Sequence, residues 1–235
     1  TPAVSLIGAV APALEALAVS AEARSWRAPE RSGDRRLGSG NAVPGPEDVV
    51  DIVRAAAPAD ARLSVDAGAH MLPAMQRWRA SAPHDVLISN GLSTMGFALP
   101  AAIAASLVDP SRRTVAFIGD GGLMMCAPEL ATAARSRLPL TVVVFNDAAL
   151  SMIDLKQQQK GHPTRGVRYP AIDFETMAES MGCQGYRADS AAALEEVLPE
   201  ALATDGPALI DVRVDPSSYR AQFEALRGGV PASAR

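Results

Sequence analysis

The 235-residue sequence is poor in aromatic residues, cysteine and histidine. Aromatic residues make up 4% of the chain, which argues against the rows of stacking side chains that bind single-stranded nucleic acid. Two cysteines and three histidines are too few for a disulfide framework or a zinc module. Cys126 and Cys183 lie in apolar surroundings, so we expect them to be buried, unreactive thiols.

The chain also lacks positive charge and long apolar runs. Its net charge is −4 and its pI about 5.4, so no general attraction to nucleic acid or to anionic membranes is expected. No apolar run reaches the length of a membrane-spanning helix, and the opening TPAVSLIGAV lacks the basic start of a signal peptide. These absences predict a cytoplasmic protein that binds neither nucleic acid nor membrane.

The chain begins with Thr1 instead of methionine, already inside a pattern that predicts a strand and a helix over residues 1–21. We therefore expect a fragment, a processed product or one half of a split polypeptide. Residues 22–45 are rich in Arg, Gly, Ser and Pro, a composition typical of a linker.

From residue 46 onward, expected helices alternate with apolar strands. The helices are expected at 46–57, 69–78, 96–108, 127–137, 173–182 and 190–203, and the strands at 61–68, 85–89, 113–122, 140–147 and 207–214. Alternating strands and helices, with the strands apolar along their whole length, predict an α/β fold: a doubly wound parallel sheet with helices on both faces.

Two of these strands end in a carboxylate. VAFIGDGG places Asp120 between glycines, and LTVVVFND ends in Asp147. Parallel sheets bind ligands beyond the carboxyl ends of their strands, and a glycine turn that leads into a helix favours a phosphate. The acids would repel that phosphate unless a cation such as Mg²⁺ lay between them. The residues alone thus indicate a phosphate–metal site, the alternative being an ordinary turn or helix cap.

The order of three blocks resembles the cofactor-binding signature of thiamine-diphosphate-dependent enzymes, normally GDG followed by a spacer and NN. Here Asp147 follows Asp120 after the 26 residues 121–146. ISNGLSTMGFALPAAIAAS, residues 88–106, resembles the segment that precedes GDG in acetohydroxyacid (acetolactate) synthases and their decarboxylase relatives. VDAGAHML, residues 65–72, is similar to their loop beside the diphosphate.

The resemblance implies a role for each matching residue. The expected Mg²⁺ ligands are the side chains of Asp120 and Asp147 and the main-chain carbonyl of Ala149. The residues expected around the diphosphate are Gly68, Ala69, His70, Gly119, Gly121 and Gly122. Met95 is expected beneath the bent cofactor, and a backbone carbonyl near Ser93 is expected to accept a hydrogen bond from the aminopyrimidine. The residues expected to face the thiazolium and the substrate are Leu150, Ser151 and Met152.

Two positions depart from the family pattern. Asp147 stands where the second Asn is usual, which keeps a suitable Mg²⁺ ligand and adds a negative charge. Ser151 stands where Gly is frequent, which puts any inference about the substrate in doubt. Two alternatives also stay open at this point. His70 is either a diphosphate contact or a helix cap, and residues 154–169 are either a mobile flap over the site or an exposed helix end and loop.

The implied function is that of a thiamine-diphosphate- and Mg²⁺-dependent enzyme that acts on a 2-oxo acid, with acetolactate synthase-like carboligation after decarboxylation. Residues 46–235 resemble the C-terminal diphosphate-binding domain, and residues 1–21 the end of a middle domain. FAD is compatible with the family, but nothing in the sequence indicates it.

No residue of this chain matches the family's cofactor-activating glutamate. We expect that residue on a pyrimidine-binding domain, supplied by the same gene product or by a separate subunit, so the isolated chain is expected to be inactive. A homodimer or tetramer is implied. The alternatives are a simple 2-oxo acid decarboxylase, a non-catalytic cofactor-binding subunit or fragment, and an unrelated nucleotide-binding α/β protein.

Overall fold

The computed structural model describes residues 42–226 together with Pro12 and Glu15, so the domain remnant expected at 1–21 and most of the expected linker at 22–45 lie outside the described residues. The described part holds a six-stranded sheet in the order β2-β1-β3-β4-β6-β5, and every neighbouring pair is parallel. The strands are β1 (Arg62–Val65), β2 (Val86–Ile88), β3 (Thr114–Gly119), β4 (Leu140–Asn146), β5 (Gln184–Ala188) and β6 (Ala208–Arg213).

The helices lie between the strands along the chain. They are α2 (Pro46–Ala56), α3 (Met71–Arg77), α4 (Ala98–Val108), α5 (Asp120–Cys126), α6 (Glu129–Arg135), α7 (Ser151–Gln159), α8 (Phe174–Ser180), α9 (Ala191–Ala203), the short 3₁₀ helix η1 (Pro216–Ser218) and α10 (Tyr219–Leu226). The expected strand at 113–122 ends earlier, at Gly119, because Asp120 already begins α5. No sequence pattern predicts α10.

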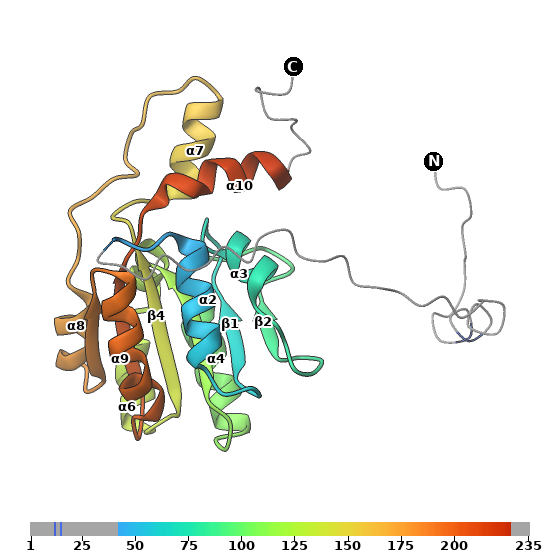
Figure 1. The fold of residues 1–235 in the computed structure, drawn as a ribbon, viewed down its shortest axis with the longest axis vertical. Helices are drawn as coiled ribbons and strands as arrows, with labels where there is room; N and C mark the ends of the chain where they lie inside the picture. Colours follow the sequence, from blue (N-terminus) through green and yellow to red (C-terminus); the bar gives the residue numbers. More distant parts are fainter. Residues whose placement is uncertain (1–11, 13–14, 16–41, 227–235) are drawn as a thin grey trace. The chain divides into compact units, whose positions relative to one another are not determined.

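Helices cover both faces of the sheet (Figure 1). Strand β4 shows how its residues divide between them: Val143 and Phe145 join the core under α2, α3 and α9, whereas Val142 and Val144 join the core under α4, α6 and α8. This alternation follows from the two-residue period of a strand, and it explains why β4 is apolar along its whole length. The prediction of a doubly wound parallel sheet is confirmed.

The order of the strands determines where a ligand site forms. From β1 the chain moves to β2 on one side of the sheet, and it then returns to β3 on the other side of β1. The connections that leave β1 and β3 therefore run in opposite directions. Between them lies a crevice at the carboxyl edge of the sheet. The loop after β4, the next strand, borders the same crevice because β4 pairs with β3 from Leu140 to Phe145.

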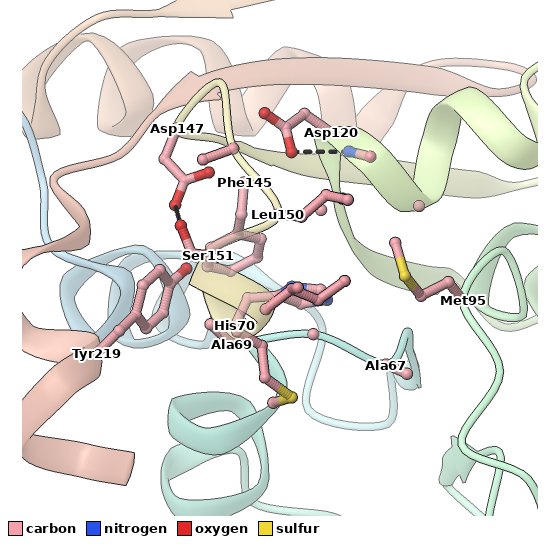
Figure 2. A pocket seen from close by; sticks show the side chains of 17 residues that line it. Ala67, Ala69, His70, Met95, Asp120, Phe145, Asp147, Leu150, Ser151 and Tyr219 are labelled. Carbon is pink, nitrogen blue, oxygen red and sulfur yellow. Dashed lines mark hydrogen bonds between the residues drawn. The ribbon is translucent and has the colours of Figure 1, made fainter. Parts of the chain in front are cut away.

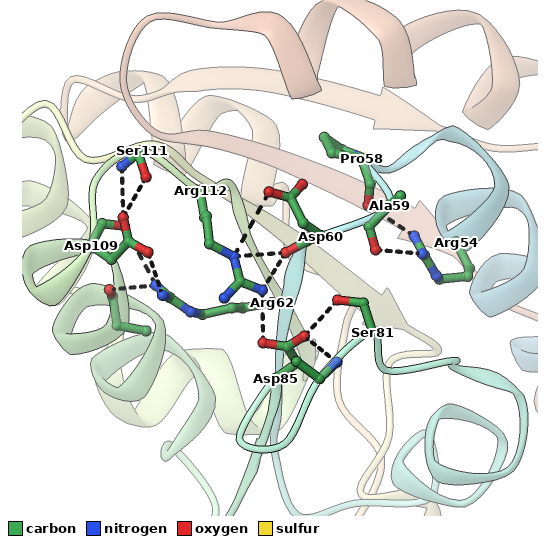
Figure 3. Close-up of polar contacts among 12 residues, drawn as sticks. Arg54, Pro58, Ala59, Asp60, Arg62, Ser81, Asp85, Asp109, Ser111 and Arg112 are labelled. Carbon is green, nitrogen blue, oxygen red and sulfur yellow. Dashed lines mark hydrogen bonds and ion pairs between the residues drawn. The ribbon is translucent and has the colours of Figure 1, made fainter.

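Arginine side chains hold the opposite, amino edge of the sheet (Figure 3). Arg62, at the start of β1, pairs with Asp109 at 2.7 Å, and Arg112, just before β3, pairs with the buried Asp85 at 2.7 Å. Neighbouring Arg113 donates to the carbonyl oxygens of residues that follow or end α9. These contacts tie the amino-edge loops to one another.

Asp66 is a buried carboxylate directly after β1. It accepts hydrogen bonds from the amides of Gly96, Phe97 and Ala98 at 3.0, 2.7 and 3.1 Å. These are amides that the first turn of a helix, here α4, leaves without a partner. A Cβ atom on Gly122 of α5 would lie 2.1 Å from the Asp66 carboxylate. The last glycine of the GDGG turn is therefore required by the packing of α5 against β1 and α4.

Replacing Gly122 by Ala is expected to lower the free energy of unfolding by about 2–4 kcal/mol, because the methyl group must displace the carboxylate that caps α4. Urea denaturation followed by circular dichroism measures this. Gly91→Ala is the matched control, since nothing lies within 4 Å of its Cβ position. Equal stability of the two variants would contradict this account of Gly122.

Candidate cofactor and metal site

The loops after β1, β3 and β4 line one cavity at the carboxyl edge of the sheet (Figure 2). The predicted site residues among its lining are Gly68, Ala69, His70, Met95, Gly119, Asp120, Gly121, Gly122, Asp147, Ala149, Leu150, Ser151 and Met152. Ser93 is the predicted residue that the structure leaves outside this lining; it is exposed and has a φ of 49°. The fold thus brings together the segments that follow β1, β2, β3 and β4, which are far apart along the chain.

Asp120 begins α5 with its side chain buried. One carboxylate oxygen, Oδ1, accepts hydrogen bonds from the Gly121 amide at 2.7 Å and from the Tyr169 hydroxyl at 2.8 Å. The other, Oδ2, is buried without a hydrogen-bond partner. Burial raises the pKa of Asp120, and the Tyr169 hydroxyl counteracts that rise. A buried carboxylate oxygen without a partner is costly, so this atom is suited to a cation.

Asp147 follows β4 and supplies the second carboxylate. Its Oδ2 accepts a hydrogen bond from the Ser151 hydroxyl at 2.5 Å. Burial raises the pKa of Asp147 to about 7; the Ser151 hydroxyl opposes that rise, and the neighbouring Asp120 carboxylate adds to it. Two acids that disfavour each other's charge are stabilised when a positive charge lies between them.

The residue before Asp147 has a structural role. The Asn146 side chain is buried and donates to the Asp211 carboxylate at 2.7 Å and to the Ile172 carbonyl at 3.1 Å. It thereby fixes the end of β4 to β6 and to the loop before α8. Asn146 holds the strand end from which the Asp147 side chain projects.

The donor set of the cavity fits Mg²⁺. Within residues 42–226, no three side chains of His, Cys, Asp or Glu group into a metal cage. A cation between Asp120 and Asp147 would therefore take its remaining ligands from backbone carbonyls, water or phosphate oxygens, which is the set that Mg²⁺ prefers. The Ala149 carbonyl suits this role. The two backbone hydrogen bonds on either side of it use the Leu150 amide and the Ala148 carbonyl, so neither uses the Ala149 oxygen.

Glycine keeps the backbone of two of the loops open. A Cβ atom on Gly121 would lie 2.4 Å from the side chain of Leu150, and one on Gly68 would lie 2.6 Å from the ring of His70. A larger residue at either place would have to displace the Leu150 side chain or the His70 ring. The peptide groups there can approach a ligand closely, as a phosphate cradle requires.

His70 is buried and stacks on Phe145, with ring centroids 5.2 Å apart. Burial lowers the pKa of His70 to about 4, so the ring is neutral at pH 7. Its Nε2 atom has no hydrogen-bond partner, and the side chain does not cap α3, although His70 directly precedes that helix. The helix-cap alternative is wrong. A contact with a diphosphate would use a hydrogen bond from a neutral ring.

Two tyrosines belong to the site although no sequence pattern indicates them. Tyr169 donates to Asp120, and Tyr219 of α10 lines the cavity beside Asp147 and Ser151 (Figure 2). Burial, together with the carboxylates of the site, raises the pKa of Tyr219 well above its usual range, so its hydroxyl stays protonated. Both residues come from segments downstream of the GDG and ND motifs, where the sequence carries no recognisable signal.

Residues 154–169 form a helix end followed by a loop. The segment continues α7 to Gln159, and its last residues form a short antiparallel ribbon with the loop after β4. The Leu150 amide donates to the Val167 carbonyl at 2.8 Å, and the Tyr169 amide donates to the Ala148 carbonyl at 3.2 Å. The segment is a helix end and a loop whose final part is hydrogen-bonded to the site.

A parallel α/β sheet with two acids and a glycine turn at its switch point defines the class of nucleotide- and diphosphate-binding proteins. The family model described as "Thiamine pyrophosphate enzyme, C-terminal TPP binding domain" matches residues 66–212. The chain belongs to this family. The prediction of the family is thus confirmed, and the alternative of an unrelated nucleotide-binding protein is wrong.

Relatives and solved structures agree with this assignment. The chain is 38% identical over 170 residues to acetolactate synthase of Bacillus subtilis, which covers 72% of this chain and 30% of the relative. It is 33% identical over 227 residues to the catabolic acetolactate synthase of Raoultella terrigena, covering 91% of this chain and 41% of the relative. The thiamine diphosphate-dependent 4-hydroxybenzoylformate decarboxylase of Rhodococcus jostii superposes with a TM-score of 0.71 at 28% identity, over 76% of this chain and 34% of that one. The chain thus spans less than half the length of these relatives.

Within the described residues, no helix is both long enough and apolar enough to cross a membrane.

The buried His70 predicts a pH dependence of stability. Its pKa of about 4 in the folded chain lies below its ordinary value of 6.5, so the unfolded chain binds the extra proton first. The contribution of the neutral His70 ring to the free energy of unfolding is complete above pH 6.5. It falls by up to about 3 kcal/mol as the pH drops to 4. Urea unfolding of His70→Phe at several pH values should lack this component.

The exposed His162 provides the control, since His162→Gln should keep the pH dependence of the wild-type chain. If His70→Phe and the wild-type chain lose stability in parallel between pH 6.5 and 4, His70 does not carry the effect.

Proposed function

We propose that this chain supplies the diphosphate and metal half of the active site of a thiamine-diphosphate- and Mg²⁺-dependent enzyme that acts on a 2-oxo acid. The observation that carries the proposal is the pairing of the unpartnered Asp120 Oδ2 with the Asp147 carboxylate, beside a glycine turn at the carboxyl edge of the sheet. The family membership supplies the identity of the diphosphate.

Each group in the cavity then has a task. Asp120, Asp147 and the Ala149 carbonyl would hold the cation, and the backbone of Gly121 and Gly122 would face the diphosphate. The remaining residues proposed to surround the cofactor are Gly68, Ala69, His70, Ser93, Met95, Gly119, Leu150, Ser151 and Met152, to which we add Tyr219. When bound, thiamine diphosphate supplies an electron sink next to the carbonyl carbon of the substrate.

The proposed activity needs a second, pyrimidine-binding domain that carries the activating glutamate. An apolar surface adjoins the site where such a domain would dock: Met124 and Met125 of α5 are 47% and 61% exposed, and they border a cavity with Leu150 and Ile172. Exposed methionines beside a half-built site favour coverage by another domain or subunit. A homodimer or tetramer is the proposed assembly.

Two reactions fit this site. Acetolactate synthase-like carboligation is favoured by the synthases among the relatives, and simple decarboxylation by the superposed decarboxylase. Pyruvate supplied to the assembled enzyme distinguishes them: acetolactate as the product supports the first, and acetaldehyde the second.

Cofactor binding tests the proposal directly. Calorimetric titration of thiamine diphosphate into the protein assembled with its pyrimidine-binding domain should give binding with Mg²⁺ present and none with a chelator present. Binding of ATP or NAD in place of thiamine diphosphate would overturn the proposal.

Replacing Asp120 by Asn is expected to weaken Mg²⁺-dependent binding of thiamine diphosphate by at least about 100-fold, because a carboxylate ligand is lost. The folded chain should persist, since Asn keeps the side-chain shape. Asp205→Asn removes the same charge from a side chain that is 80% exposed and pairs with Arg137, and it should bind like the wild-type chain. Unchanged affinity in Asp120→Asn, measured by the same titration, would remove Asp120 from the metal site.

A further inference from the structure

We propose that Tyr169 is a positioning residue for the metal site, which holds the Asp120 carboxylate so that its second oxygen stays free for the cation. The inference rests on the proposed function, because it assigns a role toward the same cation. It concerns a residue that lies 49 positions downstream of Asp120 and outside both the GDG and ND motifs.

The first step is the way in which the backbone places Tyr169. Residues on either side of Arg168 are hydrogen-bonded to residues on either side of Ala149, through the Leu150 amide to Val167 at 2.8 Å and the Tyr169 amide to Ala148 at 3.2 Å. The Val167 side chain is buried and anchors this ribbon. Tyr169 is therefore attached to the loop after β4, which carries Asp147 and the Ala149 carbonyl.

The second step is the direction of the side chain. From this ribbon the Tyr169 hydroxyl reaches Asp120, the first residue of α5 after β3, and donates to Oδ1 at 2.8 Å. The Gly121 amide donates to the same oxygen at 2.7 Å. Two donors on Oδ1 fix the rotation of the carboxylate, and Oδ2 remains buried without a partner. The hydroxyl links the two loops that would share the cation.

The third step concerns the space around the ring. The Tyr169 hydroxyl lies 3.0 Å from the position that a Cβ atom on Gly121 would take. Glycine at 121 thus admits the tyrosine as well as leaving the backbone open. A hydrogen bond from outside the ligand shell orients a carboxylate ligand, and loss of such partners typically weakens metal affinity by about 10- to 100-fold.

Tyr169→Phe tests the inference, because it removes the hydroxyl and keeps the ring. Titration of the chain with Mn²⁺ in the presence of excess thiamine diphosphate, followed by the paramagnetic resonance signal of free Mn²⁺, gives the metal affinity. We expect the affinity to fall by about tenfold. At saturating Mn²⁺ the affinity for thiamine diphosphate should return to that of the wild-type chain, since the diphosphate contacts are intact.

The matched control is Tyr186→Phe on β5, which removes a hydroxyl that lies 3.5 Å from that of Thr204. It should bind Mn²⁺ like the wild-type chain. Unchanged or tighter Mn²⁺ binding by Tyr169→Phe overturns the inference, and so does a weak affinity for thiamine diphosphate that saturating Mn²⁺ fails to restore. If the wild-type protein, assembled with its pyrimidine-binding domain, binds neither Mn²⁺ nor thiamine diphosphate, the proposed function fails instead.

Discussion

The repulsion between a buried and a half-buried carboxylate at the ends of neighbouring strands is the constraint on which the site depends. Strands β3 and β4 are paired in parallel, so Asp120 and Asp147 emerge at the same edge of the sheet. Burial raises the pKa of each acid, and the Asp120 charge raises that of Asp147 further. A fold keeps such a pair only where a cation or a proton relieves it, and the glycine turn beside the pair leaves room for a cation and its phosphate ligand.

Asp66 shows how an acid in the same kind of position is satisfied without a ligand. It also follows a buried strand directly, yet three consecutive backbone amides at the start of α4, those of Gly96, Phe97 and Ala98, donate to its carboxylate. Asp120 differs because one of its oxygens has no partner in the described chain. A sequence shows only that an acid ends a strand. Whether that acid caps a helix or keeps an oxygen free for a ligand depends on which backbone amides lie within hydrogen-bond distance of it.

The sequence alone predicts features that come from a repeating pattern or from residues adjacent along the chain. Apolar strands alternating with helices predicted the doubly wound sheet, and acids and glycines at strand ends predicted Asp120, Asp147 and the glycine turn between β3 and α5. The other predicted residues of the cavity lining came from the resemblance to a known family. Tyr169 and Tyr219 could not be predicted, because they reach the site through a ribbon and a helix whose placement depends on tertiary contacts. Ser93 lies outside the cavity lining although Met95, two residues further along the same loop, lines it, and periodicity does not distinguish these two positions.

The two departures from the family pattern become one feature in the structure. An asparagine at position 147 would need no strong donor, whereas a half-buried carboxylate does, and the Ser151 hydroxyl supplies that donor at 2.5 Å. A glycine at 151 would leave Asp147 without it. Ser151 is the first residue of α7, and Asp147 lies in the loop between β4 and that helix. The two residues that depart from the family pattern are thus hydrogen-bonded to each other in the structure, and the hydroxyl of one satisfies the added carboxylate of the other.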